Sequence, residues 1–318
     1  MWYGTTRPLR HRALGLATAL LALALAPIAA GAPSGCPPGT SITTCSTAPS
    51  APPGWPPDVP ATLDPELQRL VDAFVEDRRG RYGIAVLHLP SRRAAAHQVD
   101  VVMPSASLYK LGVLYAAFHE QRAGRLDFDE VFTVDEWSMQ HEGDQYLYLG
   151  RRLTAREAIQ FMIARSDNTA ARLLIRRIGR DRINALIERF GLREFRLDDT
   201  AQASPRDVLR LLLAIAQGRA VDVEASQAMV DLLLQQEIQD RIPRFLPFIP
   251  IAHKTGNLLD TAHDAGVIYA PAGPYILVAM STGLPWDQVG VQAIAELSRD
   301  LYAHFHPGVR LVEREEAP

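Results

Sequence analysis

Residues 249–282 have the sequence IPIAHKTGNLLDTAHDAGVIYAPAGPYILVAMST, in which three apolar runs are separated by short polar and glycine-containing segments. Runs of this length and composition predict β-strands over Ile249–Thr255, Ala265–Ala270 and Tyr275–Thr282. An amphipathic helix is expected next, from Trp286 to about Phe305. The chain therefore ends in three strands and a helix.

Strand character is otherwise concentrated near residue 90. Tyr82–Leu89 and Ala94–Val101 are both strand-like, and residues 90–92 between them predict a hairpin turn. An amphipathic helix is expected before them, opened by Asp64 and Pro65 and running to about Arg79.

The middle of the chain has helical periodicity, in Leu108–Phe118, Thr154–Arg165, Thr169–Ile178 and Pro205–Ala216. The order is helix, two strands, several helices, three strands, helix. It predicts an α/β (α+β) protein in which strands from both chain ends form one five-stranded antiparallel sheet with flanking helices and an inserted all-α lobe. A cleft between sheet and lobe is the expected place for a site.

The first residues have the layout of a secretory signal. Arginines at 7, 10 and 12 precede an uncharged Ala/Leu-rich run, Ala13–Ala32, so residues 1–32 predict a signal peptide and an exported protein: periplasmic, cell-envelope or secreted. A membrane anchor is the alternative. Nine prolines between Pro33 and Pro60 predict a linker over 33–61, followed by a domain at 62–311 and a tail at 312–318.

Both cysteines, Cys36 and Cys45, lie in that linker, outside the expected domain. In an oxidising compartment they could form a small disulfide loop. Alternatively, Cys36 could be a lipid-attachment site that tethers a lipoprotein to a membrane.

Composition excludes one class of partner. The 318 residues are 47% apolar, which is ample for a buried core, and the formal net charge is −3 with a pI near 6.3. No basic surface of the kind that binds nucleic acid is expected.

The distribution of lysine is unusual. Among the 33 basic residues only Lys110 and Lys254 are lysines. Lysine can release its proton when it is buried or near another cation, whereas arginine cannot. The two lysines therefore indicate positions at which chemistry excludes arginine, although codon bias is an alternative.

Three short motifs could carry that chemistry. Ser107-Leu108-Tyr109-Lys110 places a serine and a lysine on one face of a helix start, where the helix dipole favours a developing oxyanion. Ser166-Asp167-Asn168 lies between two helical runs and could simply be a helix cap. Lys254-Thr255-Gly256 ends a strand and could be an exposed strand terminus with a glycine turn.

In this order the three motifs resemble those of class A β-lactamases and penicillin-binding proteins. The resemblance extends over Thr62–His306. Further segments that look like this family are Leu108–Phe118 with Gly124-Arg125-Leu126, Leu153–Ala170, Arg241-Ile242-Pro243 and Asp264–Ile268. It implies a two-lobed β-lactamase-like fold, no metal or organic cofactor, and acyl transfer from a small-molecule β-lactam or a peptidoglycan peptide. We expect a monomer.

The resemblance also implies catalytic roles. Ser107 would be the nucleophile that forms an acyl-enzyme, Lys110 its base, and Ser166 the relay that protonates the departing nitrogen. Asn168 would bind the acyl-side amide of the substrate.

The remaining implied residues bind the substrate. Lys254 and Thr255 would contact its carboxylate beside Gly256, and the backbone N–H groups of Ser107 and Asn257 would form an oxyanion hole. His263 lies where some relatives carry a carboxylate-binding cation, and a packed or solvated histidine is the alternative.

One segment departs from the family pattern. Class A enzymes carry a Glu-x-x-Leu-Asn segment whose glutamate activates water for deacylation, but here residues 195–205 are FRLDDTAQASP, a shortened loop without it. Asp198 or Asp199 could take over the water, or could be ordinary turn residues. The loss of a general base typically slows a step about 10²- to 10⁴-fold.

Several functions therefore remain open. The chain could be a β-lactamase with slow turnover, or a D-Ala-D-Ala peptidase for which the missing glutamate is normal. It could also be a serine-dependent amidase, or a non-catalytic module that binds cell-wall fragments.

Overall fold

The computed structural model describes residues 51–52, 55–139 and 146–308. The predicted signal peptide, Cys36, Cys45, most of the linker and the tail at 312–318 lie outside these residues. Within the described part of the chain, no helix is both long and apolar enough to span a membrane.

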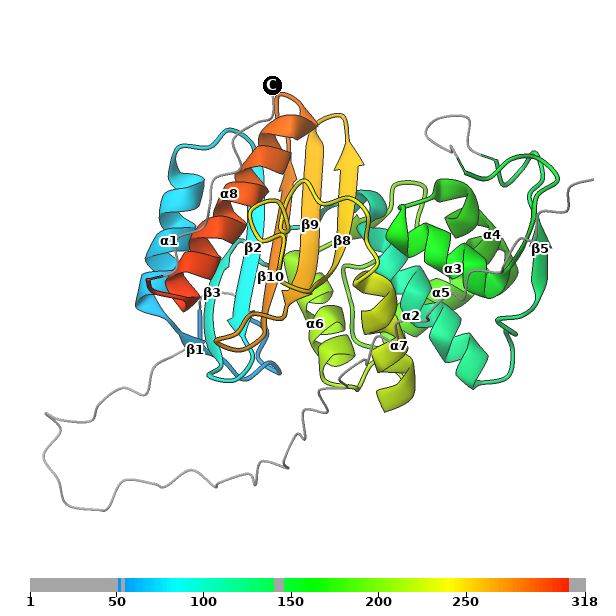
Figure 1. Ribbon diagram of the computed structural model, residues 1–318, viewed down its shortest axis with the longest axis horizontal. Helices are drawn as coiled ribbons and strands as arrows, with labels where there is room; N and C mark the ends of the chain where they lie inside the picture. Colours follow the sequence, from blue (N-terminus) through cyan, green and yellow to red (C-terminus); the bar gives the residue numbers. More distant parts are fainter. Residues whose placement is uncertain (1–50, 53–54, 140–145, 309–318) are drawn as a thin grey trace, which may run out of the picture. The chain divides into compact units, whose positions relative to one another are not determined.

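A six-stranded sheet has the order β1-β3-β2-β10-β9-β8 (Figure 1). Its strands are β1 (Thr62–Leu63), β2 (Arg81–His88), β3 (Arg93–His97), β8 (Ile251–Leu258), β9 (Thr261–Ile268) and β10 (Tyr275–Thr282). The N-terminal and C-terminal halves meet where β2 pairs antiparallel with β10, from Tyr275 opposite His88 to Thr282 opposite Arg81. The expected assembly from both chain ends is confirmed.

The sheet has one strand more than the five predicted. The five longer strands are antiparallel, and the two-residue β1 adds to the outer edge, parallel to β3. The Thr62 N–H donates to the Arg92 carbonyl at 2.8 Å, and the Asp64 N–H donates to Ala94 at 2.9 Å. A strand this short leaves no periodic pattern in the sequence.

Both faces of the sheet are covered. Helices α1 (Pro65–Glu76) and α8 (Asp287–Phe305) pack on one face, and α6 (Pro205–Ala216) packs on the other (Figure 1). Alternate residues of one strand therefore belong to two separate apolar cores: Leu277 faces α1 and α8, while Val278 faces the helical lobe. Strands buried on both faces have continuous apolar sequences, which is why they were recognisable.

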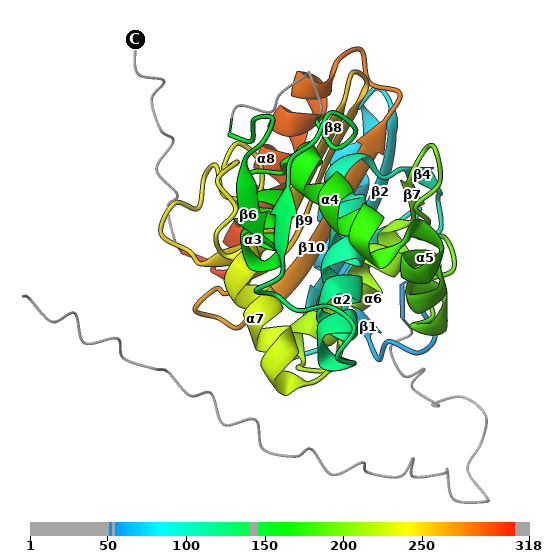
Figure 2. The same cartoon turned by 90° about the vertical axis from the view of Figure 1, so that its right-hand side faces the viewer.

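The inserted lobe is helical, as predicted, and faces the viewer in Figure 2. Its other helices are α2 (Tyr109–Arg122), α3 (Ala155–Ala164), α4 (Asn168–Ile178), α5 (Arg180–Arg189) and α7 (Val223–Leu233). Two short antiparallel pairs complete it: β4 (Met103–Pro104) with β7 (Gln202–Ala203), and β5 (Val131–Thr133) with β6 (Arg152–Thr154).

The end of the proline-rich segment packs on the domain. Trp55 and Val59 are buried in the core shared with the helical lobe, and the Trp55 indole donates to the Val59 carbonyl at 2.9 Å. The chain thus joins the core before Thr62, where the domain was expected to begin.

Candidate active site

Ser107 lies where the chain passes from the sheet region into the helical lobe. It is the middle residue of the 3₁₀ turn η1 (Ala106–Leu108), which leads directly into α2. The Ser105 N–H donates to the Ala201 carbonyl at 2.8 Å, which holds this turn against the shortened loop. A cavity of about 810 Å³ opens beside Ser107.

The walls of this cavity come from six parts of the chain. They are the segment around Ser107, Trp137, the first two turns of α4, the start of α5, the shortened loop and the end of β8. The lining includes Tyr109, Trp137, Asn168, Arg172, Ile175, Arg180, Leu197, Asp198, Asp199, Asn257 and Leu258.

Lys110 lies one turn into the molecule from Ser107 and is fully buried. Its Nζ donates to the Asn168 Oδ1 at 2.7 Å and to the Ser166 carbonyl, and it lies 3.3 Å from the Ser166 Oγ. The first two motifs therefore meet through this one amine.

Within the Ser-Asp-Asn motif, Asp167 has a structural role, whereas Ser166 and Asn168 contact Lys110. Asp167 is the N-cap of α4, accepting from the Ala170 N–H at 2.7 Å, so the helix-cap interpretation is correct for this residue. Ser166 has φ +58°, a left-handed conformation that non-glycine residues seldom adopt. This backbone turn directs the Ser166 side chain toward the two lysines.

The Ser166 hydroxyl bridges the two lysines of the chain. Its Oγ accepts from the Lys254 Nζ at 2.8 Å and lies 3.3 Å from the Lys110 Nζ. Lys254 is fully buried, and burial lowers its pKa well below the usual value, with the charge of Lys110 lowering it further. Two ammonium groups around one hydroxyl repel each other, so a neutral amine is favoured within this pair.

Strand β8 approaches Ser107 closely because residue 256 is glycine. A Cβ at Gly256 would lie 3.1 Å from the Ser107 backbone nitrogen and 3.1 Å from the Ala106 Cβ. Strand β8 is also the sheet edge that faces the helical lobe (Figure 1), so alternate N–H groups along it are not used by the sheet. The backbone of this edge can therefore offer a donor beside Ser107.

Arg241 supports that edge from within the protein. It is buried, and its Nη1 donates to the His263 carbonyl at 2.7 Å and to the Gly256 carbonyl at 3.2 Å. It also contacts the Asn257 side chain, which donates to Asp287 at 2.8 Å. The sequence marks Arg241 only as part of a segment that resembles the family, which does not reveal these contacts, so sequence analysis gave it no role.

Two residues predicted to contact the substrate, Thr255 and His263, are buried away from the cavity. Thr255 is 1% exposed and does not line the cavity. His263 is fully buried: its Nε2 donates to the Pro104 carbonyl at 2.8 Å, its Nδ1 accepts from the Ser281 N–H at 3.1 Å, and burial lowers its pKa to about 4. The expected role of His263 as a substrate-binding cation is wrong, since it is neutral and packed; it joins β9 to β4 instead.

A buried carboxylate lies behind the lysines. The Nδ1 of His253 donates to the Asp264 Oδ1 at 2.9 Å, and the Ile242 N–H donates to Oδ2 at 3.1 Å, with both side chains fully buried. Asp264 opposes the lowering of the Lys254 pKa. Sequence reasoning did not identify this pair, because alternating strand residues do not show which face they share.

The shortened loop forms another wall of the cavity. Arg196 and Gln202 exchange backbone hydrogen bonds of 2.9 and 3.0 Å, and the Asn184 side chain holds the Leu197 backbone on both sides. Leu197 is buried at the cavity wall. Asp199 is fully exposed and pairs with the Arg180 Nη1 at 3.1 Å, which places its carboxylate at the rim.

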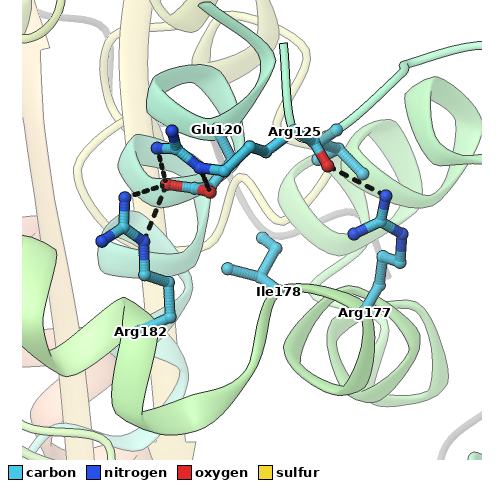
Figure 3. A pocket seen from close by; sticks show the side chains of 6 residues that line it. Glu120, Arg125, Arg177, Ile178 and Arg182 are labelled. Atoms are coloured by element: carbon cyan, nitrogen blue, oxygen red, sulfur yellow. Dashed lines mark hydrogen bonds and ion pairs between the residues drawn. The ribbon is translucent and has the colours of Figure 1, made fainter. Parts of the chain in front are cut away.

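A second hollow, of about 630 Å³, lies at the far end of α2 (Figure 3). There the Glu120 carboxylate accepts from Arg125 at 2.5 and 2.8 Å and from Arg182 at 3.1 Å. The hydrogen bond from Arg125, and to a smaller extent that from Arg182, lowers the pKa of Glu120 to about 2. The carboxylate is saturated by donors and ties α2 to α5, which indicates a structural role.

A serine at a helix start, two buried lysines and a second serine between them define a β-lactamase-like serine hydrolase site. Residues 63–305 match the model of the β-lactamase enzyme family, and the chain belongs to this family.

The relatives include both lactamases and a penicillin-binding protein. β-Lactamase L2 of Stenotrophomonas maltophilia is 27% identical over 222 residues, covering 63% of this chain and 73% of that protein. The solved structure of PBP-A is 28% identical with a TM-score of 0.73, covering 77% of this chain and 98% of PBP-A. A variant of PBP-A, solved as an acyl-enzyme complex with penicillin G, is 27% identical with the same TM-score and the same coverage of each chain.

Proposed function

We propose that this protein opens β-lactam rings by forming an acyl-enzyme on Ser107. Water then hydrolyses the acyl-enzyme slowly and releases the opened β-lactam. The observation that carries the proposal is the Ser166 hydroxyl held between Lys110 and Lys254 beside the Ser107 cavity. Lys110, Ser166 and Lys254 are joined by hydrogen bonds, and Ser107 precedes Lys110 by three residues at the start of α2, which supports a path from base to relay to nucleophile.

The first half of the reaction follows from this path. Neutral Lys110 takes the Ser107 proton, and the Ser107 oxygen attacks the lactam carbonyl carbon. The N–H groups of Ser107 and Asn257 bind the resulting oxyanion, each such donor typically contributing roughly 3 to 4 kcal/mol. When the carbon–nitrogen bond breaks, Ser166 gives its proton to the nitrogen and recovers one from the lysine pair.

Substrate positioning uses the remaining motif residues. Asn168, already held by Lys110 at 2.7 Å, binds the acyl-side amide. Lys254 and Thr255 of β8 would bind the substrate carboxylate, although both side chains are buried in the free protein. Gly256 allows that strand to lie against Ser107.

Deacylation is the slow half. Leu197 occupies the wall of the cavity, and Asp199 is held at the rim by Arg180. Without a positioned base, water attack is expected to be about 10²- to 10⁴-fold slower than in relatives that have one.

A D-Ala-D-Ala peptidase is the second candidate. The short loop and the 28% identity to PBP-A over most of both chains favour it. Penicillin would then be an inhibitor that leaves a long-lived acyl group on the same serine.

One experiment separates these candidates. Residues 51–318 are mixed with benzylpenicillin and a chromogenic cephalosporin, and the mass of the adduct on Ser107 is followed with time. Loss of the adduct over seconds to minutes, with coloured product, supports the β-lactamase; an adduct stable for hours, together with release of D-alanine from a D-Ala-D-Ala peptide, supports the peptidase. Ser107→Ala, checked for folding by circular dichroism, should form no adduct, and an adduct on that variant would contradict the proposal.

We also propose that the chain is exported. The support is the arginine-then-alanine/leucine layout of residues 1–32. Expression of the full chain in a Gram-negative host, followed by fractionation and mass analysis of the mature N-terminus, tests this. A mature chain that starts near residue 31 or 33 in the periplasm is expected, whereas an N-terminal lipid on Cys36 would show lipoprotein processing.

A further inference from the structure

One wall of the catalytic cavity is a single face of α4. Asn168, Arg172 and Ile175 all line the cavity, at spacings of four and three residues. Residues at such spacings lie above one another on a helix, with about 1.5 Å of rise per residue. If Asn168 binds the substrate amide, an acyl substituent that runs along α4 would reach Arg172, about 6 Å further on.

Arg172 is held by an aromatic ring. Its guanidinium carbon lies 4.6 Å from the centre of the Trp137 ring, which also lines the cavity and is 51% exposed. A guanidinium stacked on an aromatic face keeps its in-plane N–H groups available to other acceptors. The Arg172 Nε is buried and has no hydrogen-bond acceptor within the described residues.

The neighbouring arginines differ from Arg172 in one respect. Arg176 lies 5.0 Å from the same ring but pairs with Asp135 at 2.6 Å. Arg180 pairs with Asp199 at 3.1 Å. For Arg172, no carboxylate partner is present in the ranges 55–139 and 146–308.

We infer that Arg172, stacked on Trp137, is a specificity-determining residue that selects substrates with a carboxylate on the acyl side. This inference rests on the proposed acyl transfer at Ser107. The ligand class is an acyl donor with an anionic substituent close to its amide, either a β-lactam or a peptide. A planar guanidinium fork binds a carboxylate through two parallel hydrogen bonds.

Two carboxylates of the cavity oppose this preference. Asp199 is offset by Arg180, whereas Asp198 lies on the loop wall and is open to solvent. Solvent screens its repulsion, so a net preference remains. Because a hydrogen bond to a charged group typically contributes about 1.5 to 3 kcal/mol, the expected effect is roughly tenfold or somewhat more.

The test compares two penicillins. Benzylpenicillin and carbenicillin differ by one carboxylate on the carbon next to the acyl-side amide. The second-order rate constant of acylation is measured for both, by adduct mass, with wild type, Arg172→Gln, Arg172→Lys and Arg176→Gln. Arg172→Gln should lower the carbenicillin-to-benzylpenicillin ratio about tenfold and change the benzylpenicillin rate less than about twofold. The ratio for Arg172→Lys should lie between those of the wild type and Arg172→Gln. Arg176→Gln, the matched control, should leave the ratio unchanged.

The possible failures are distinguishable. An unchanged ratio in Arg172→Gln, or an equal loss for both penicillins, overturns the inference. If wild type forms no adduct with either penicillin, the proposed acyl transfer fails. The ratio of the two dissociation constants, measured by calorimetry on Ser107→Ala with and without Arg172→Gln, then decides the inference alone: a tenfold change supports it, and no change refutes it.

Discussion

Replacement of Lys110 by arginine separates the charge of this residue from its ability to accept a proton. Both side chains can carry a positive charge, and the acceptors around the amine, Asn168 Oδ1 and the Ser166 carbonyl, remain. An arginine in a protein does not deprotonate. Lys110→Arg should therefore fix a positive charge at this position and remove the base.

The contacts of Ser166 indicate the size of the effect. Its Oγ lies 2.8 Å from one amine and 3.3 Å from the other, so the two nitrogens are at most about 6 Å apart. At an effective dielectric constant of about 20, two unit charges at that distance repel by roughly 3 kcal/mol. The pair thus favours one neutral amine in the wild type, and arginine removes this option at position 110. We expect acylation to slow about 10²- to 10⁴-fold.

The assay is the adduct-mass time course with benzylpenicillin, in the wild type, Lys110→Arg and Lys110→Gln. Lys110→Gln removes the charge as well as the base, and its thermal unfolding should show no loss beyond that of Lys110→Arg, since it relieves the repulsion. Both variants should acylate slowly at every pH between 6 and 9. If Lys110→Arg retains acylation within about tenfold of wild type while folded, Lys110 is not the base, and the reasoning is refuted.

Four further predictions follow from the same contacts. Gly256→Ala should slow acylation roughly tenfold, because the new Cβ presses on Ser107; unchanged adduct kinetics would contradict it. Glu120→Gln should destabilise the fold by roughly 2 kcal/mol at pH 7 in urea unfolding, less than full pairing implies because both arginines are partly exposed. Because the pKa of Glu120 is lowered from 4.5 to about 2, the stability that it contributes is complete above pH 4.5 and is lost as the pH falls toward 2. Between pH 4.5 and 2 the wild type should therefore lose this stability, whereas the variant should not. Asp264→Asn should lower stability by about 2 to 3 kcal/mol in the same assay, because the buried His253 loses its charged acceptor. Asp199→Asn should change the rate of adduct loss less than about twofold, and a tenfold slowing would instead make Asp199 the group that activates water.

Elements that are buried on both sides or defined by local chemistry were predictable. Strand β10 was predicted over the residues that form it, because a strand covered on both faces is apolar throughout. Helix α6 was also predictable, since Ser204 caps it and Pro205 occupies its first turn. Strand β1 could not be predicted, because two residues carry no periodicity and their pairing depends on β3.

The same distinction between local and long-range information applies to the site residues. The three motifs predicted Ser107, Lys110, Ser166 and Lys254 as site residues because each motif is a short local sequence at or near an element boundary. Arg241 and Asp264 lie in segments that resemble the family, but their contacts are with residues 15 or more and 11 positions away, respectively, so the sequence did not reveal what they do.

The sequence by itself determined the order of strands and helices, the three motifs with their two lysines, and the absence of the Glu-x-x-Leu-Asn segment from the shortened loop. Only the tertiary structure decided the state of each ionisable group. His263 is neutral because packing buries it completely, the pKa of Lys254 is lowered by burial and further by the nearby Lys110, and Arg172 faces the cavity because α4 turns it there. Charge state depends on burial and on neighbours distant in sequence, and folding alone brings these together.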